Sequence, residues 1–94
     1  MRKLTKEIKE AFFAGQSKKV SNTRTNGTSV FLHSNEIIKR DPSGLILFTF
    51  AGWGSTITRE RFNGILGVDV YQKDFEQYYN GEKVIDLWDW HAID

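Results

Sequence analysis

The 94-residue sequence contains no cysteine and only one proline. The missing cysteines exclude disulfide bridges, thiolate nucleophiles and sulfur-based zinc sites, and they argue against a disulfide-stapled secreted protein. No apolar run approaches the roughly 20 residues that a membrane-spanning helix needs, and the charged start of the chain lacks the apolar segment of a signal peptide. We therefore expect a protein that works in the cytoplasm and has no membrane as a partner.

Residues that carry catalytic chemistry are also scarce. His33 and His91 are the only histidines, and the sequence has neither a Gly-x-Ser-x-Gly motif nor a spacing that indicates a Ser-His-Asp triad. Lone histidines of this kind are more often surface or hydrogen-bonded structural residues than catalysts. We predict that the protein is not an enzyme and that it holds no cofactor and no metal.

The segment Gly52 to Ile57 is the one place where a strand, a glycine turn and a helix start follow each other as in nucleotide-binding proteins. A dinucleotide fingerprint needs a third glycine where Ile57 stands, and a P-loop needs a Gly-Lys-Ser/Thr sequence that is absent. We therefore predict that these glycines serve the fold around a largely buried Trp53. Anion binding at the following helix start, beside Arg59 and Arg61, is the alternative.

Aromatic residues make up 14% of the chain and apolar residues 39%, which is enough for one modest core, so we predict a single domain over residues 1–94. Helical spacing of apolar residues in the first 14 residues predicts an N-terminal helix. Asn26-Gly27 and Asn80-Gly81 predict two-residue hairpin turns, and the Asp41 to Gly44 segment predicts another turn. The predicted fold class is α+β, with an N-terminal helix, an antiparallel meander of three to four strands, a short second helix and a C-terminal β-hairpin.

The net charge of +1 conceals an uneven distribution. Residues 1–40 carry nine Lys/Arg against three Glu, a net charge of +6, whereas residues 41–94 carry four against nine acids, a net charge of −5. Such asymmetry hints at nucleic acid or at a basic partner. We expect the fold to interleave the two halves, so that the two fields cancel.

Several strings of the sequence resemble one protein family. They are VSNTRTNGTSVFLHSNEIIKRDPSG, the AGW that begins at residue 51, the helix-like TRERFNG, and VDVYQKDFEQYYNG. The chain is similar over most of residues 8–81 to a family of small uncharacterised proteins encoded by tailed bacteriophages. In LHSN, Ser34 replaces the glycine typical of that family's turn, which predicts a turn without a strictly positive φ there. The resemblance implies the infected bacterial cell as the setting and implies no activity.

Two binding functions remain. The first is an accessory protein that docks on a host protein as an inhibitor or modulator, using the aromatic and acidic tail because Trp dominates interface hot spots. Its candidate residues are Asp86, Trp88, Asp89 and Trp90. The second is nucleic-acid binding through the basic N-terminal half, with candidate residues Lys18, Lys19, Arg24, Lys39 and Arg40. Either a monomer or a homodimer is compatible with the sequence, and the alternative for the tail is a contribution to the core.

Overall fold

The computed structural model of the protein describes residues 2–93. The secondary structure begins with a helix, continues as a meander of strands, and returns to a strand after a second helix and a small hairpin sheet. The elements are α1 (Lys3–Phe13), β1 (Ser17–Val20), β2 (Thr23–Asn26), β3 (Ser29–Leu32), β4 (Asn35–Arg40), β5 (Ile46–Phe48), α2 (Thr56–Leu66), β6 (Val70–Lys73), β7 (Glu76–Tyr79), β8 (Glu82–Lys83) and β9 (His91–Ala92). This order confirms the predicted α+β fold class.

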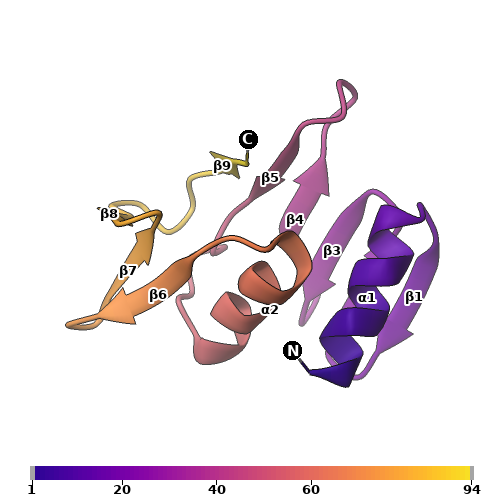
Figure 1. Ribbon diagram of the computed structural model, residues 1–94, viewed down its shortest axis with the longest axis horizontal. Coiled ribbons are helices and arrows are strands. Elements are labelled where there is room, and N and C mark those ends of the chain that lie inside the picture. The colour runs from indigo at the N-terminus through magenta and orange to yellow at the C-terminus, as the bar shows by residue number, and fades with distance from the viewer. Residues whose placement is uncertain (1, 94) are drawn as a thin grey trace.

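Two antiparallel sheets organise these strands. The larger has six strands in the order β1-β2-β3-β4-β5-β9, and the smaller has three in the order β6-β7-β8 within the described residues. The meander therefore holds five strands and not the three to four predicted, because the polar Ser17–Val20 segment pairs as well. Both helices lie on one face of the larger sheet (Figure 1).

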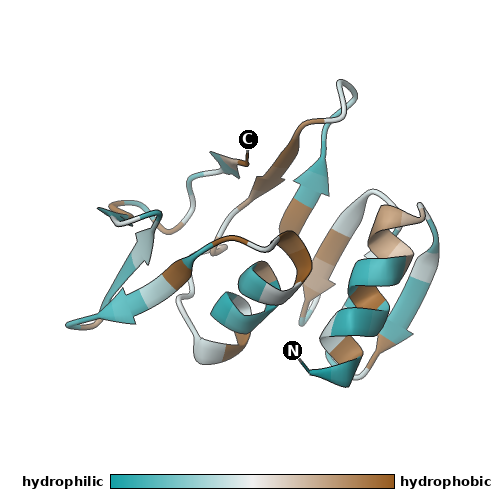
Figure 2. Ribbon diagram, viewed as in Figure 1, coloured by the Kyte–Doolittle hydropathy of each residue, from teal (hydrophilic) through white to brown (hydrophobic). Residues whose placement is uncertain are grey.

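The core lies between that sheet face and the helices. Ile8 and Phe12 of α1 and Phe62 of α2 are completely buried, as are Ile38 and Phe48 of the sheet. The rings of Phe48 and Phe62 lie 4.6 Å apart between centroids. Hydropathy follows this arrangement, since β5 is hydrophobic while most of β1, at the far edge, is hydrophilic (Figure 2).

The two Asn-Gly pairs behave differently. Asn80 and Gly81 form the predicted two-residue turn, with φ of 53° and 82° between the paired residues of β7 and β8. The prediction for Asn26-Gly27 is wrong, because Thr25 pairs with Val30 and leaves a four-residue connection. There the Asn26 carboxamide oxygen accepts hydrogen bonds from the amides of residues 28 and 29, at 3.0 and 2.8 Å. Side-chain bonding of this kind replaces the tight turn.

The strand order also overturns the expected mixing of charge. Residues 1–40 form α1 and the four strands at one end of the larger sheet, whereas β5, β9 and the small sheet lie toward the other end. The colours of Figure 1 show this division, from indigo and purple on one side to orange and yellow on the other. Because the meander adds strands in chain order, most of the basic residues lie toward one end of the larger sheet and most of the acidic residues toward the other, although α2 of the second half packs against α1.

Candidate functional site

Residues 51–55 form a ridge between two hollows. After the tight turn at Ala51 and Gly52, where φ is 54° and 80°, the side chains of Trp53 and Ser55 face one hollow while Gly54 faces the other. A methyl group on Gly52 would lie 2.5 Å from the Trp88 ring, and one on Gly54 would lie 2.6 Å from the Gln77 side chain. The two glycines therefore permit close packing of the chain. This packing accounts for the strand, glycine turn and helix start around residues 52–57 without a bound phosphate.

Trp53 does not occupy the predicted position. Its side chain is 73% exposed, whereas we predicted that it is largely buried. Phe48, Phe50 and Phe62 already fill the space between sheet and helices, so the larger indole remains outside. The ring instead forms one wall of the first hollow.

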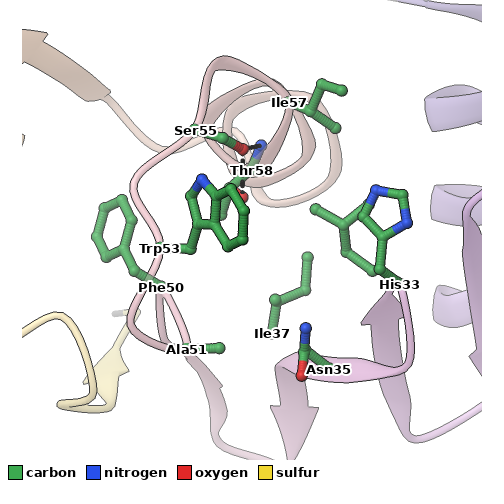
Figure 3. Close-up of a pocket in the computed structure, with 10 residues that line it drawn as sticks. His33, Asn35, Ile37, Phe50, Ala51, Trp53, Ser55, Ile57 and Thr58 are labelled. Carbon is green, nitrogen blue, oxygen red and sulfur yellow. Dashed lines mark hydrogen bonds between the residues drawn. The ribbon is translucent and has the colours of Figure 1, made fainter.

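This hollow, which we call the Trp53 hollow, has a volume of about 400 Å³. Leu32, Ile37 and Phe50 give it an apolar floor, and Trp53 lies opposite His33 across it (Figure 3). Ser55 also lines it, but its hydroxyl accepts the amide of residue 58 at 3.1 Å as the N-cap of α2. Pockets of this size with apolar floors are typical of binding sites.

The rim of the Trp53 hollow contains a strained turn. His33 and Ser34 connect β3 to β4 with φ of 50° and 71°, so the expectation that Ser34 avoids positive φ is wrong. Type I′ hairpins demand positive φ at both positions, and the pairing of Leu32 with Asn35 leaves exactly two residues for the turn. The cost is about 1–2 kcal/mol for each residue that is not glycine.

The second hollow, which we call the Phe75 groove, lies between the small sheet and the segment after it. Phe75 and Ile85 border it and are 93% and 82% exposed. Val84 and Leu87 supply deeper apolar surface, and the groove has a volume of about 260 Å³. Phe75 stands at the tip of the β6–β7 turn with φ of 66°.

The predicted tail residues divide into two groups. Trp88 is 68% exposed and its ring packs against Gly52. Asp86 holds the backbone of this segment, because its carboxylate accepts the Trp88 amide at 2.8 Å and its carbonyl accepts the Asp89 amide at 3.1 Å. Trp90 is half-buried instead, with the Lys39 ammonium 3.9 Å above its ring centre, so that a predicted partner-binding residue contacts a predicted nucleic-acid-binding one.

The predicted basic residues are also separated. Lys18, Lys19 and Arg24 line one shallow depression on the outermost strands. Arg40 lies elsewhere: its guanidinium donates to the Gly27 carbonyl at 2.8 Å and to the Phe12 carbonyl at 3.1 Å. Because these bonds hold the end of α1 against the sheet, Arg40 serves the fold and lies apart from the other predicted basic residues.

The two arginines predicted to bind an anion, Arg59 and Arg61, form hydrogen bonds with groups of the protein instead. Arg61 is completely buried and donates to Thr23 at 3.0 Å and to Thr5 at 3.2 Å, and it pairs with Glu60. Arg59 donates to the Gly54 carbonyl at 3.0 Å and to Gln77 and Gln72 at 2.9 and 3.2 Å. Arg61 thus ties α1 and α2 to β2, which corrects the prediction that it holds an anion.

Sequence reasoning missed Phe75 and Ile85. A usable signal was present, because in the alternating string VYQKDFEQYY the Asp74-Phe75 pair stands where a two-residue turn belongs. Glycine is typical of the second turn position, so a phenylalanine there is anomalous. The Asn-Gly signature five residues later predicts only the next turn and gives no information about this one.

Comparison with known proteins identifies a family for the chain. The family model described as Kyanoviridae Gp96 protein matches residues 1–92. No curated protein and no solved structure matches the chain. Within residues 2–93, no helix of the protein is long and apolar enough to cross a membrane.

Proposed function

The chain belongs to the Kyanoviridae Gp96 protein family, whose members are encoded by tailed phages of cyanobacteria. From this premise we propose that it is a non-enzymatic accessory protein that docks on a host protein inside the infected cell. The docking surface comprises the ridge, the Trp53 hollow and the Phe75 groove. Of the large apolar side chains in residues 2–93, the four most exposed belong to it. These are Trp53, Phe75, Ile85 and Trp88.

Phe75 is the observation that carries the proposal. Its backbone is held at positive φ, which costs about 1–2 kcal/mol in a residue with a Cβ, and its ring is 93% exposed. The fold therefore gains almost no apolar burial in return for this strain. Strained residues that bring the fold no benefit are typical of binding and catalytic sites, and an exposed aromatic at a hairpin tip is suited to insertion into a partner's pocket.

The charges around this surface indicate the chemistry of the partner. Residues 69–89 carry six Asp/Glu against two Lys, a net charge of −4. Complementarity of potential then favours a host segment that offers apolar side chains flanked by Lys or Arg. The same charge opposes a second copy of this chain at the surface, since two acidic rims would meet, and we propose that the protein is monomeric there.

The test is capture of host proteins from cyanobacterial lysate by the immobilised protein, with nuclease present. We expect a specific host protein that wild type retains and that purified wild type then binds in isothermal titration calorimetry. Phe75→Gly is expected to weaken that binding at least tenfold, as for an interface hot spot.

Phe13→Ala is the matched control, because Phe13 is also an exposed phenylalanine, with 50% of its surface accessible, but lies on α1, away from the ridge. Its affinity for the captured protein should equal that of wild type. Equal loss of affinity in both variants, or retention of the same proteins by Phe75→Gly as by wild type, would refute the proposed surface. Dimerisation of wild type that Phe75→Gly abolishes would identify a second copy as the occupant and refute the host partner.

A further inference from the structure

The face of the larger sheet opposite the helices has a composition unlike the rest of the surface. Thr23, Thr25, Val30, Ile38 and Phe48 point inward and are buried, so their alternating neighbours point outward. The strand pairing aligns Lys19, Arg24, Phe31 and Glu36 in one row across β1 to β4, with Lys39 in the next row. We call this set, together with Trp90, the outer face.

We infer that the outer face binds single-stranded nucleic acid. This inference goes beyond the proposed docking function, uses a different surface and does not depend on it. It combines three observations: aromatic rings that carry cations, a local excess of positive charge, and the separation of the two charged halves of the chain.

Two aromatic rings lie on the outer face, each with a cation over it. The Arg24 guanidinium carbon lies 4.0 Å from the Phe31 ring centre, and the Lys39 ammonium nitrogen lies 3.9 Å from that of Trp90. Unpaired bases stack both on aromatic rings and on guanidinium planes, and open antiparallel sheets supply such platforms in single-strand-binding domains. A duplex keeps its bases stacked internally and has no use for these rings.

The charge of the outer face suits a phosphate backbone. Lys19, Arg24 and Lys39 lie on it, and Lys18 and Lys19 line the same depression as Arg24 at its edge. Glu36 is the one acidic side chain among the outward residues of β1 to β4, and it accepts the Ser29 hydroxyl at 2.6 Å. Most acidic residues of the chain lie toward the other end of the sheet. A bound nucleic-acid strand can therefore follow the basic end without meeting most of the carboxylates.

Fluorescence anisotropy with labelled 20-nucleotide RNA, DNA single strands and DNA duplex tests the inference. Wild type should bind a single strand with micromolar or lower Kd at about 50 mM salt. Three engaged cations predict a slope of about −2 in log K against log salt, hence roughly 20-fold weaker binding at about 200 mM. Comparing RNA with single-stranded DNA identifies the preferred nucleic acid. A mononucleotide should compete only weakly for the same site.

Lys19→Glu with Arg24→Glu should weaken binding more than tenfold and reduce the slope to about −0.7. The control is the double variant Lys3→Glu/Lys6→Glu, at two exposed positions on α1. It has the same net charge as the first double variant and should bind nearly as tightly as wild type. Trp90→Leu removes a ring and no charge, so it should lower affinity about tenfold with an unchanged slope. Circular dichroism melts verify that each variant is folded.

Three results would overturn the inference. One is duplex binding as tight as single-strand binding, and another is equal weakening by the two double reversals, which would indicate diffuse attraction to the whole basic half. The third is wild-type binding no tighter than about 10⁻⁴ M, the weak limit of nonspecific association.

Discussion

Replacing Phe75 by glycine should make the protein more stable. Phe75 has φ of 66° in a two-residue turn, a conformation that costs about 1–2 kcal/mol with a side chain and almost nothing in glycine. Glycine also raises the entropy of the unfolded chain, which removes about 0.4–1 kcal/mol of the gain. Loss of the ring costs only about 0.3 kcal/mol, because 93% of its surface is exposed and buried apolar area contributes about 25 cal/mol per Å².

The net expectation, from the middle of these ranges, is therefore a gain of about 0.5 kcal/mol, equivalent to a rise in Tm of roughly 2–4 °C for a domain of this size. Urea unfolding followed by circular dichroism measures it, with the m-value as a check that the unfolded state is unchanged. Asp74→Gly is the matched comparison, since Asp74 also has positive φ, at 51°, but aspartate tolerates this region better. Its gain should be smaller.

A destabilised Phe75→Gly variant would refute the reasoning, because it would mean that the ring contributes to the fold. A gain in stability combined with loss of host-protein binding would separate the two roles of the residue. Stability and function would then conflict at this one position, as is common at binding sites.

Three further outcomes follow from the contacts. Arg61→Met should destabilise the fold by about 3–5 kcal/mol in urea unfolding, because it removes the cation paired with Glu60 and leaves the buried hydroxyls of Thr5 and Thr23 without the Arg61 donor; a loss below about 1 kcal/mol would contradict the role of Arg61 as a tie between elements. Trp53→Ala should change stability by less than about 1 kcal/mol, since the indole is mostly exposed, and a Tm lowered by 10 °C or more would show that it packs in the core. Burial lowers the pKa of His91, and the nearby Asp89 carboxylate offsets this only in part, so the folded state disfavours the protonated imidazole. The free energy of unfolding should therefore fall as pH decreases below the ordinary histidine pKa of about 6.5. Urea midpoints between about pH 7.5 and pH 5.5 measure this fall, and His91→Gln should remove it.

Local patterns were sufficient for the helices and for several turns. Ser55 caps α2, Gly67 ends it in the left-handed region, and the Asp41 to Gly44 turn closes with a hydrogen bond of 2.9 Å. These features depend on a few neighbouring residues, which is why local sequence is enough to specify them. Asn26-Gly27 failed because the Asn26 side chain bonds the backbone of its own loop, an alternative that a two-residue signature does not distinguish.

The candidate site was harder to predict because it depends on which large side chains the core leaves outside. Trp53, flanked by two glycines, looked like a buried ring, but three phenylalanines occupy the available volume. Arg61 looked like a surface cation near a helix start, but contacts more than 35 residues away in sequence, to Thr5 and Thr23, decide its burial. No local pattern carries information of that range.

The separation of the basic and acidic halves also makes the effective charge of the molecule depend on ionic strength. Its longest extent is 36 Å, and the Debye length is about 30 Å in roughly 10 mM salt but only about 8 Å in roughly 150 mM salt. In dilute buffer an approaching molecule senses both halves at once, close to the net charge of +1. At physiological salt it senses only the end that it faces. The isoelectric point near 8.0 then describes neither end, and the protein presents two independent surfaces of opposite sign.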